Sequence, residues 1–273
     1  MAAGMLLDMS IYAYLLFGIP LTAGFQLFVR KRPIKDLWVR GGPGLSLRSV
    51  SLKLAILLAI YPVYQLVQLV VSGVSGQGLD SILYALAAIV GAGAAAYALE
   101  QFRRKTWRYL GLCLATAGLL GVLLIMGPLV LAARYDPSTA TALATGGSLE
   151  PVALFGIEQL LLFIPVVFMM EEVAFRGAID SHVRHPGERH GVGSTVYGVV
   201  SAIVVSVLWG LWHYPVTPLP HTSVIEHVAL VAYLEVAVGP FFSLFWRRSG
   251  NLMVPGFVHA AIDSVRNALG GTP

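Results

Sequence analysis

Long apolar stretches separated by short polar segments follow one another along the whole chain. A transmembrane helix needs about 20 consecutive, mainly apolar residues to cross the hydrocarbon core of a bilayer. Eight stretches meet this requirement, at residues 9–29, 54–73, 80–99, 109–133, 151–175, 195–213, 222–245 and 251–268. The expected fold class is therefore all-α, a polytopic transmembrane helical bundle of about eight spans.

The spans run without an internal repeat, a low-complexity tail or a recognisable soluble domain. We therefore expect residues 1–273 to form a single integral-membrane domain. Spans one to four lie in residues 1–150, and spans five to eight in residues 151–268 contain the polar residues that suggest catalysis. No basic region followed by a small-residue cleavage site precedes the first apolar run, so we interpret that run as a retained span.

The composition supports a membrane protein. Hydrophobic residues make up 57% of the 273 residues and charged residues only 12%, which leaves too few polar side chains to cover a soluble domain. The net charge of +4 does not indicate a nucleic-acid partner, because the basic residues cluster at the ends of the spans. Cys113 is the single cysteine, which excludes a disulfide within the chain.

The distribution of lysine and arginine predicts the orientation. All but Arg134 and Arg266 of the 18 basic residues lie after spans one, three, five and seven. Basic loops stay on the cytoplasmic side of a membrane. We therefore expect these loops to be cytoplasmic, both termini to lie outside, and the protein to reside in the plasma (inner) membrane.

The fifth span ends in two adjacent carboxylates and an arginine, Glu171, Glu172 and Arg176. On a helix, Glu172 and Arg176 are four residues apart and can pair, whereas Glu171 points about 100° away. One carboxylate can thus be neutralised while the other stays available. The alternative is an acidic and basic cluster that extends to the membrane interface. Ionisable residues inside a span indicate a functional site.

Two other spans present polar faces. Trp209 and His213 are four residues apart near the end of the sixth span, and His259 and Asp263 have the same spacing within the last. Carboxylates and imidazoles that converge inside a membrane suit water activation, metal binding or proton relay.

Further ionisable residues have simpler interpretations. Glu158 and Glu235 lie within spans and could line the same cavity, although a bond to a neighbouring helix is the more common role of such a carboxyl group. The remaining histidines fall in loops or at span ends, where solvated or interfacial positions are expected: His182, His185, His190, His221 and His227.

The order and spacing of these motifs over residues 151–268 resemble the CPBP family, the CAAX-protease and bacteriocin-processing intramembrane proteases, also called the ABI family. The motifs are Glu171-Glu172-x-x-x-Arg176, an aromatic-x-x-x-His213 and His259-x-x-x-Asp263. Gly177, Ser206 and Pro255 also stand where that family often has them.

The resemblance implies a glutamate-dependent endopeptidase without a cofactor, acting on membrane-embedded or membrane-anchored peptides and proteins. By similarity, Glu171 and His213 would activate the attacking water. His259 and the residue at position 263 would stabilise the oxyanion of the tetrahedral intermediate.

By the same similarity, Glu172 and Arg176 would hold their helix in place.

The chain departs from the family pattern at two positions. Trp209 stands where the family usually has Phe, which predicts a bulkier wall of the substrate cleft. Asp263 stands where some members have Asn, and an ionised carboxylate cannot donate to an oxyanion. We therefore expect Asp263 to orient His259, which would donate instead.

Other functions stay open on the residues alone. Glu171, His213 and His259 could bind zinc, although no His-Glu-x-x-His sequence is present. A proton-coupled transporter could use the same acids as a relay, but the internal repeat of many carriers is missing. A non-catalytic membrane scaffold or immunity protein is a third alternative.

The catalytic interpretation requires Glu171 and His213 to lie close together. A straight sixth helix from Ser194 would place His213 about 28 Å along it, near the outer end, while Glu171 is only a few turns from the cytoplasmic loop. The two can meet only if the fifth helix continues past Arg176 and the sixth starts late or tilts. The connecting loop, residues 182–193, is long enough for this.

Overall fold

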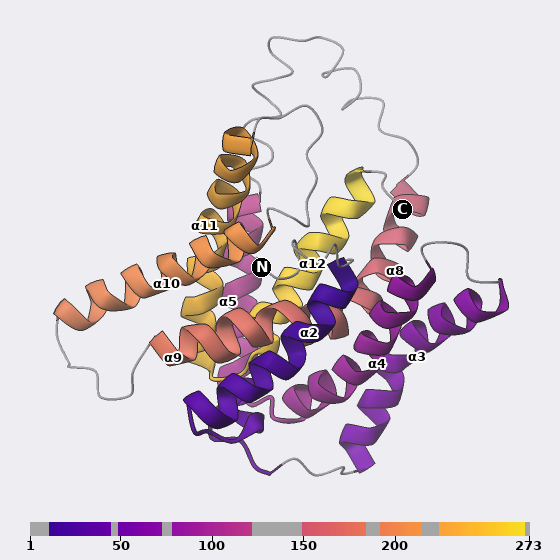
Figure 1. The fold of residues 1–273 in the computed structure, drawn as a ribbon, viewed down its shortest axis with the longest axis horizontal. Coiled ribbons are helices and arrows are strands. Elements are labelled where there is room, and N and C mark those ends of the chain that lie inside the picture. The colour runs from indigo at the N-terminus through magenta and orange to yellow at the C-terminus, as the bar shows by residue number, and fades with distance from the viewer. Residues whose placement is uncertain are drawn as a thin grey trace, which may run out of the picture.

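The computed structural model consists of helices joined by short connections (Figure 1). It describes residues 11–44, 49–72, 78–121, 149–183, 192–213 and 224–270. Within these ranges there is no β-strand, and one isolated bridge pairs Val39 with Asn251. The all-α class is thus confirmed.

The described helices follow the predicted spans closely. Their bounds are α2 Ile11–Gly24 with its π-helical extension η1 Phe25–Val29, the 3₁₀ turn η2 Ile34–Leu37, α3 Ser49–Val71, α4 Gly78–Glu100, α5 Arg104–Gly121, α8 Leu149–Val167, the π-helix η4 Phe168–Asp180, α9 Ser181–Val183, α10 Val192–His213, α11 Val224–Ser249 and α12 Met253–Gly270. Each predicted span overlaps one of these helices. Residues 122–133 of the fourth predicted span lie outside the described residues.

Three stretches of the described helices are long and apolar enough to cross a membrane: Leu52–Val71, Ser81–Glu100 and Thr195–His213. Two shorter apolar helical stretches are Phe17–Val29 and Met253–Val265. The protein is therefore an all-α helical membrane bundle, and the count of eight spans stays a prediction.

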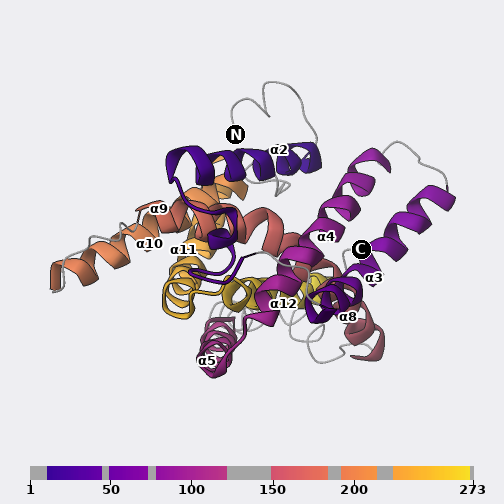
Figure 2. The ribbon, with the colours of Figure 1, turned by 90° about the horizontal axis from the view of Figure 1, so that it is seen from below.

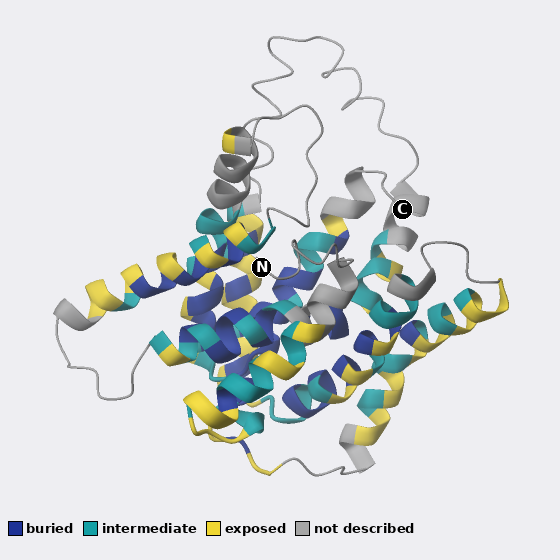
Figure 3. Ribbon diagram, viewed as in Figure 1, coloured by how far each residue is buried: buried dark blue, intermediate teal, exposed yellow. Residues whose placement is uncertain are grey.

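The helices pack around η4. α3 packs along α4, α10 along α11, and α8 along α12, while η4 contacts α2, α4, α10 and α12. In Figures 1 and 2, α10 and α11 lie on the left and α3, α4 and α8 on the right, with α12 between these two groups. Burial follows the same arrangement, because buried residues gather where the helices cross and exposed ones line α3 and the start of α10 (Figure 3). Only 6% of the Leu52–Val71 stretch is buried, so its apolar surface suits contact with lipid.

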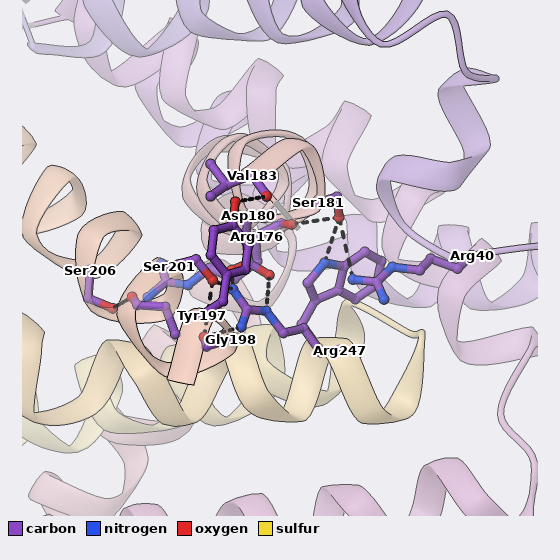
Figure 4. A network of polar contacts seen from close by, with 12 residues as sticks. Arg40, Arg176, Asp180, Ser181, Val183, Tyr197, Gly198, Ser201, Ser206 and Arg247 are labelled. Atoms are coloured by element: carbon purple, nitrogen blue, oxygen red, sulfur yellow. Dashed lines mark hydrogen bonds and ion pairs between the residues drawn. The ribbon is translucent and has the colours of Figure 1, made fainter. Parts of the chain in front are cut away.

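The ends of three predicted spans meet at one end of the bundle. Arg247, at the end of α11, forms a two-fold ion pair with the buried Asp180 of η4, at 3.0 Å from Nε to Oδ2 and 2.5 Å from Nη2 to Oδ1 (Figure 4). Nη2 also donates to Ser201 Oγ at 2.9 Å. Such bidentate pairing satisfies both charges, which a buried pair requires.

The segment after α2 packs against the same end of the bundle, where Arg247 and Asp180 lie. Arg30 donates to the backbone oxygens of Gly177 at 3.1 Å and Ser181 at 3.2 Å. Gly177 also lets η4 lie directly against the backbone of Leu37, because a Cβ there would lie 2.6 Å from the carbonyl oxygen of Leu37. Arg40 stacks over the ring of Trp246, 4.3 Å from its centroid. The basic ends of spans one, five and seven are thus tied together.

The turn between α11 and α12 sets the start of the last helix. Gly250 ends α11 with a φ of 69°, in the left-handed region that glycine adopts without strain. The side chain of Asn251 then accepts from the backbone N–H of Met253 at 2.9 Å and donates to Ala98 O at 2.7 Å. Pro255 lies in the first turn, where its missing N–H costs nothing. These contacts fix the position from which His259 reaches the interior.

Candidate active site

Glu171 lies at the centre of a polar cluster contributed by η4, α10, α11 and α12. The indole N–H of Trp209 donates to its Oε2 at 3.0 Å. Nε2 of His213 lies 3.6 Å and Nε2 of His259 lies 3.8 Å from the same oxygen. All three contacts are to Oε2, and no contact to Oε1 occurs among the described residues.

Glu172 faces the opposite way, into the protein. Its Oε1 accepts from Nδ1 of His259 at 2.9 Å and lies 3.4 Å from Nη1 of Arg176. Both Glu172 and Arg176 have fully buried side chains. The pairing predicted from their four-residue spacing is therefore present, and it also includes a histidine from another helix.

Two further carboxylates complete the cluster. Asp263 Oδ2 lies 3.3 Å from Nε2 of His259, one turn along the same helix. Glu235 Oε1, from α11, lies 3.6 Å from Nδ1 of His213. The same Nδ1 lies 3.0 Å from the backbone oxygen of Trp209. A carbonyl oxygen can only accept, so this contact places a proton on Nδ1 and makes Nε2 the acceptor of the neutral ring.

Solvent access divides the cluster into an outer and an inner part. The side chains of Glu171, His213 and Glu235 are 16%, 17% and 17% exposed, and that of Asp263 is 14% exposed. Glu172, Arg176 and His259 are buried. A reacting group must be reachable by water and substrate. The outer side chains meet this condition and His259, which is 6% exposed, borders them, whereas Glu172 and Arg176 are both 0% exposed and do not meet it.

An aromatic wall holds the cluster in place. The guanidinium of Arg176 lies over the Trp209 ring, 4.0 Å from its centroid, and 5.5 Å from the centroid of Phe242. The Trp209 ring also contacts His213 and His259 edge-on, with centroids 5.3 and 5.0 Å apart. A desolvated cation–π contact contributes about 2 kcal/mol. Trp209 is therefore a central packing residue and a hydrogen-bond donor, whereas the sequence had suggested only a bulky wall.

Two glycines let the helices approach closely enough to form this wall. A Cβ at Gly239 of α11 would lie 2.7 Å from Ser206 Cβ and 3.2 Å from Nη2 of Arg176. A Cβ at Gly256 of α12 would lie 3.1 Å from Phe168 Cδ2. A larger residue at position 239 would force a shift of α11 against α10, whereas one at position 256 would require the Phe168 ring to move slightly.

The carboxylates lie on a π-helix, which the hydropathy pattern does not predict. η4 begins at Phe168, shortly after Pro165 in α8. Proline lacks the N–H that the α-helical ladder requires, so it interrupts the i→i−4 bonds just before the change of helix type. π-helical segments are rare and often mark functional sites.

Glu171 and His213 lie close together because the fifth helix is long. η4 and α9 continue past Arg176 to Val183, whose carbonyl oxygen accepts from Tyr197 OH at 2.9 Å. The fifth helix (η4 with α9) and α10 are antiparallel. Glu171 lies as many residues before Val183 as Trp209 lies after Tyr197, so the two helices that touch at Val183 and Tyr197 also touch at Glu171 and Trp209. α10 begins at Val192, and no late start is needed.

The remaining candidates lie elsewhere. Glu158 is exposed on α8 and neighbours Tyr61 of α3, away from the cluster. The His182 ring contacts Phe25 edge-on, at 5.1 Å between centroids. His185, His190 and His221 fall outside the described residues, as does the side chain of His227. Among the described residues, no group of three or more His, Cys, Asp or Glu side chains has an arrangement that could hold a metal ion.

Residues 153–265 match the family model described as type II CAAX prenyl endopeptidase Rce1-like. The matched range contains every residue of the cluster. No curated protein and no solved structure gives a significant match to the chain.

Proposed function

We propose that the chain is a membrane protease that hydrolyses peptide bonds with water activated at Glu171, because residues 153–265 match the Rce1-like family of type II CAAX prenyl endopeptidases. One observation carries this proposal. Glu171 is a partly exposed carboxylate whose Oε2 accepts from Trp209, with two imidazole rings beside it and no hydrogen bond or ion pair to Oε1 from the described residues.

In the first step, the water at Oε1 of Glu171 attacks the carbonyl carbon of the scissile peptide. The water transfers a proton to the carboxylate as its oxygen forms the new C–O bond, and the carbonyl oxygen becomes an oxyanion. Nε2 of His213, an acceptor that lies 3.6 Å from Oε2 of the same carboxyl group, then takes the proton from Glu171. When the C–N bond breaks, His213 delivers the proton to the leaving amine nitrogen.

His259 is the proposed oxyanion donor. With carboxylates at both ring nitrogens, it works as an imidazolium that donates through both. Glu172 holds Nδ1, and Asp263 directs Nε2 towards the position of the substrate carbonyl. In this proposal Asp263 itself does not donate. Donors of this kind are typically worth about 10²–10³ in kcat.

Glu172 and Arg176 have a supporting role. Their complete burial, together with the contact of Glu172 to His259 and of Arg176 to Trp209, links the inner pair to both catalytic rings. The pair thus positions the groups that touch the substrate, while it stays out of reach of the substrate itself.

The substrate is proposed to be a membrane-anchored or membrane-embedded peptide or protein. The site lies within apolar helices, and the family description names CAAX prenyl endopeptidases. A CAAX sequence carries its prenyl group on the cysteine. We propose a multi-pass protein of the plasma (inner) membrane with its basic end in the cytoplasm, which the meeting of Arg30, Arg40 and Arg247 at one end of the bundle supports.

The test uses purified protein in liposomes and an internally quenched peptide ending in a CAAX sequence, with and without a farnesyl group. Wild-type protein should cleave the farnesylated peptide, and Glu171→Gln should lower kcat by about 10²–10⁴, the usual contribution of a general base. Equal cleavage by both proteins would overturn the proposal.

The proposed reaction needs no cofactor. A zinc enzyme that uses Glu171, His213 and His259 is the alternative, and it differs in its response to chelators. Incubation with 1,10-phenanthroline should leave cleavage unchanged. Loss of cleavage that added zinc restores would favour the metal-dependent mechanism instead.

A further inference from the structure

Glu235 belongs to none of the three motifs, yet its carboxylate lies beside the active-site cluster. It is contributed by α11, an otherwise apolar stretch at this position, and its side chain is 17% exposed. A carboxylate inside a membrane protein needs a partner, and the contact of Glu235 is to Nδ1 of His213 at 3.6 Å.

His213 therefore lies between two carboxylates, with Glu171 near Nε2 and Glu235 near Nδ1, each at 3.6 Å. The two contacts of Nδ1 have different consequences. The backbone oxygen of Trp209, at 3.0 Å, is close enough to accept the N–H and fix the tautomer. Glu235 is farther away, beyond hydrogen-bond distance, and can act on the ring only through its charge in the ionised form.

We propose that Glu235 is a positioning residue for the hydrolytic reaction, which stabilises the positive charge of His213 when Nε2 carries the proton. This proposal rests on the proposed function. The proton released by the water passes through Glu171 to Nε2 of His213, and the imidazolium is then flanked by Glu235. The proton leaves on the amine nitrogen as the C–N bond breaks, which returns His213 to the neutral form.

Packing supports a specific position for Glu235. α11 packs against α10, and Gly239, one turn beyond Glu235, lies so close to Ser206 of α10 that a Cβ there would be 2.7 Å from Ser206 Cβ. The side chain at position 235 is thus held against the face of α10 that carries His213. Glu158, another carboxylate outside the motifs, lies on α8 beside Tyr61 and forms no ion pair with His213 or His259.

The size of the effect follows from a comparison. In a serine protease, replacing the aspartate that holds the catalytic histidine by asparagine lowers kcat by about 10⁴, because the ring then adopts the wrong tautomer. Here the carbonyl of Trp209 keeps the tautomer. Only the effect of the charge is lost, and Glu235→Gln should lower kcat by about tenfold with KM unchanged.

The experiment compares kcat and KM of wild type, Glu235→Gln, Glu235→Asp and Glu158→Gln on the farnesylated quenched peptide in liposomes. Glu235→Asp keeps the charge and should retain more of kcat than the glutamine variant, and Glu158→Gln should match wild type. A kcat of Glu235→Gln equal to that of wild type overturns the proposal. So does an equal loss in the aspartate and glutamine variants, or a loss confined to KM.

A second comparison separates a role through His213 from a general effect on the fold. Glu235→Gln is added to His213→Gln, and cleavage is followed with enzyme in excess so that slow turnover is measured. No further loss is expected in the double variant, since the group that Glu235 serves is gone. Two independent, multiplying losses would overturn the proposal. If Glu171→Gln is inactive and Glu235→Gln is as active as wild type, the inference fails alone, whereas an active Glu171→Gln removes the proposed function itself.

Discussion

Replacing Trp209 by phenylalanine tests the hydrogen bond that distinguishes this chain from the family pattern. Phenylalanine keeps an aromatic ring for the stack with Arg176 and the edge contacts with the two histidines. It removes the indole N–H, which donates to Oε2 of Glu171 at 3.0 Å, together with part of the fused ring. The variant should therefore fold, and its Glu171 should be less well oriented.

The expected magnitude follows from the type of bond. A hydrogen bond to a charged group contributes about 1.5–3 kcal/mol. Each 1.36 kcal/mol corresponds to a factor of ten in rate. The loss of orientation affects the step in which Oε1 takes the proton, so we expect kcat to fall by about tenfold to hundredfold while KM stays the same.

The assay measures kcat and KM on the farnesylated quenched peptide, together with the melting temperature. Trp246→Phe is the matched control, because its indole N–H donates to Ser181 Oγ at 2.9 Å, at the basic end of the bundle. The control should lower the melting temperature and leave kcat close to the wild-type value. Full activity of Trp209→Phe would refute the reasoning, as would a loss explained entirely by unfolding.

Three further variants test the packing and the charges. Gly239→Ala should lower the stability by about 1–3 kcal/mol through overpacking, whereas Gly93→Ala, with nothing within 4 Å of its Cβ, should be neutral or slightly stabilising in thermal melts. Asp263→Asn should lower kcat about tenfold, and full activity would show that its charge does not orient His259. Asp180→Ala should cost about 3–5 kcal/mol because it leaves Arg247 buried without its partner; replacing both residues by leucine should recover much of the melting temperature, and an equally unstable double variant would contradict this explanation.

Hydropathy and spacing predicted the helices and the members of the cluster. Each predicted span corresponds to a helix where the structure describes it, because an apolar run of sufficient length leaves the backbone little choice in a membrane. The residues of the three motifs, Glu171 to Asp263, come together from three separate helices. Their four-residue spacings already indicated which faces would be polar.

Other features depend on contacts between helices, which hydropathy does not contain. Glu158 and Glu235 have similar apolar neighbours in the sequence, and only the packing of α11 on α10 brings Glu235 to His213. The indole N–H of Trp209 finds Glu171 for the same reason. The π-helix of Phe168–Asp180 was missed because the spacing argument assumes 3.6 residues per turn throughout.

Cleavage profiling of a membrane-peptide library, with wild-type protein and Glu171→Ala in parallel liposomes, tests the central claim most directly. Mass spectrometry of the products would identify each bond that is cut. The account predicts a defined set of products with wild type and their disappearance with Glu171→Ala. The same products in both samples would contradict the assignment of Glu171 as the residue that activates water.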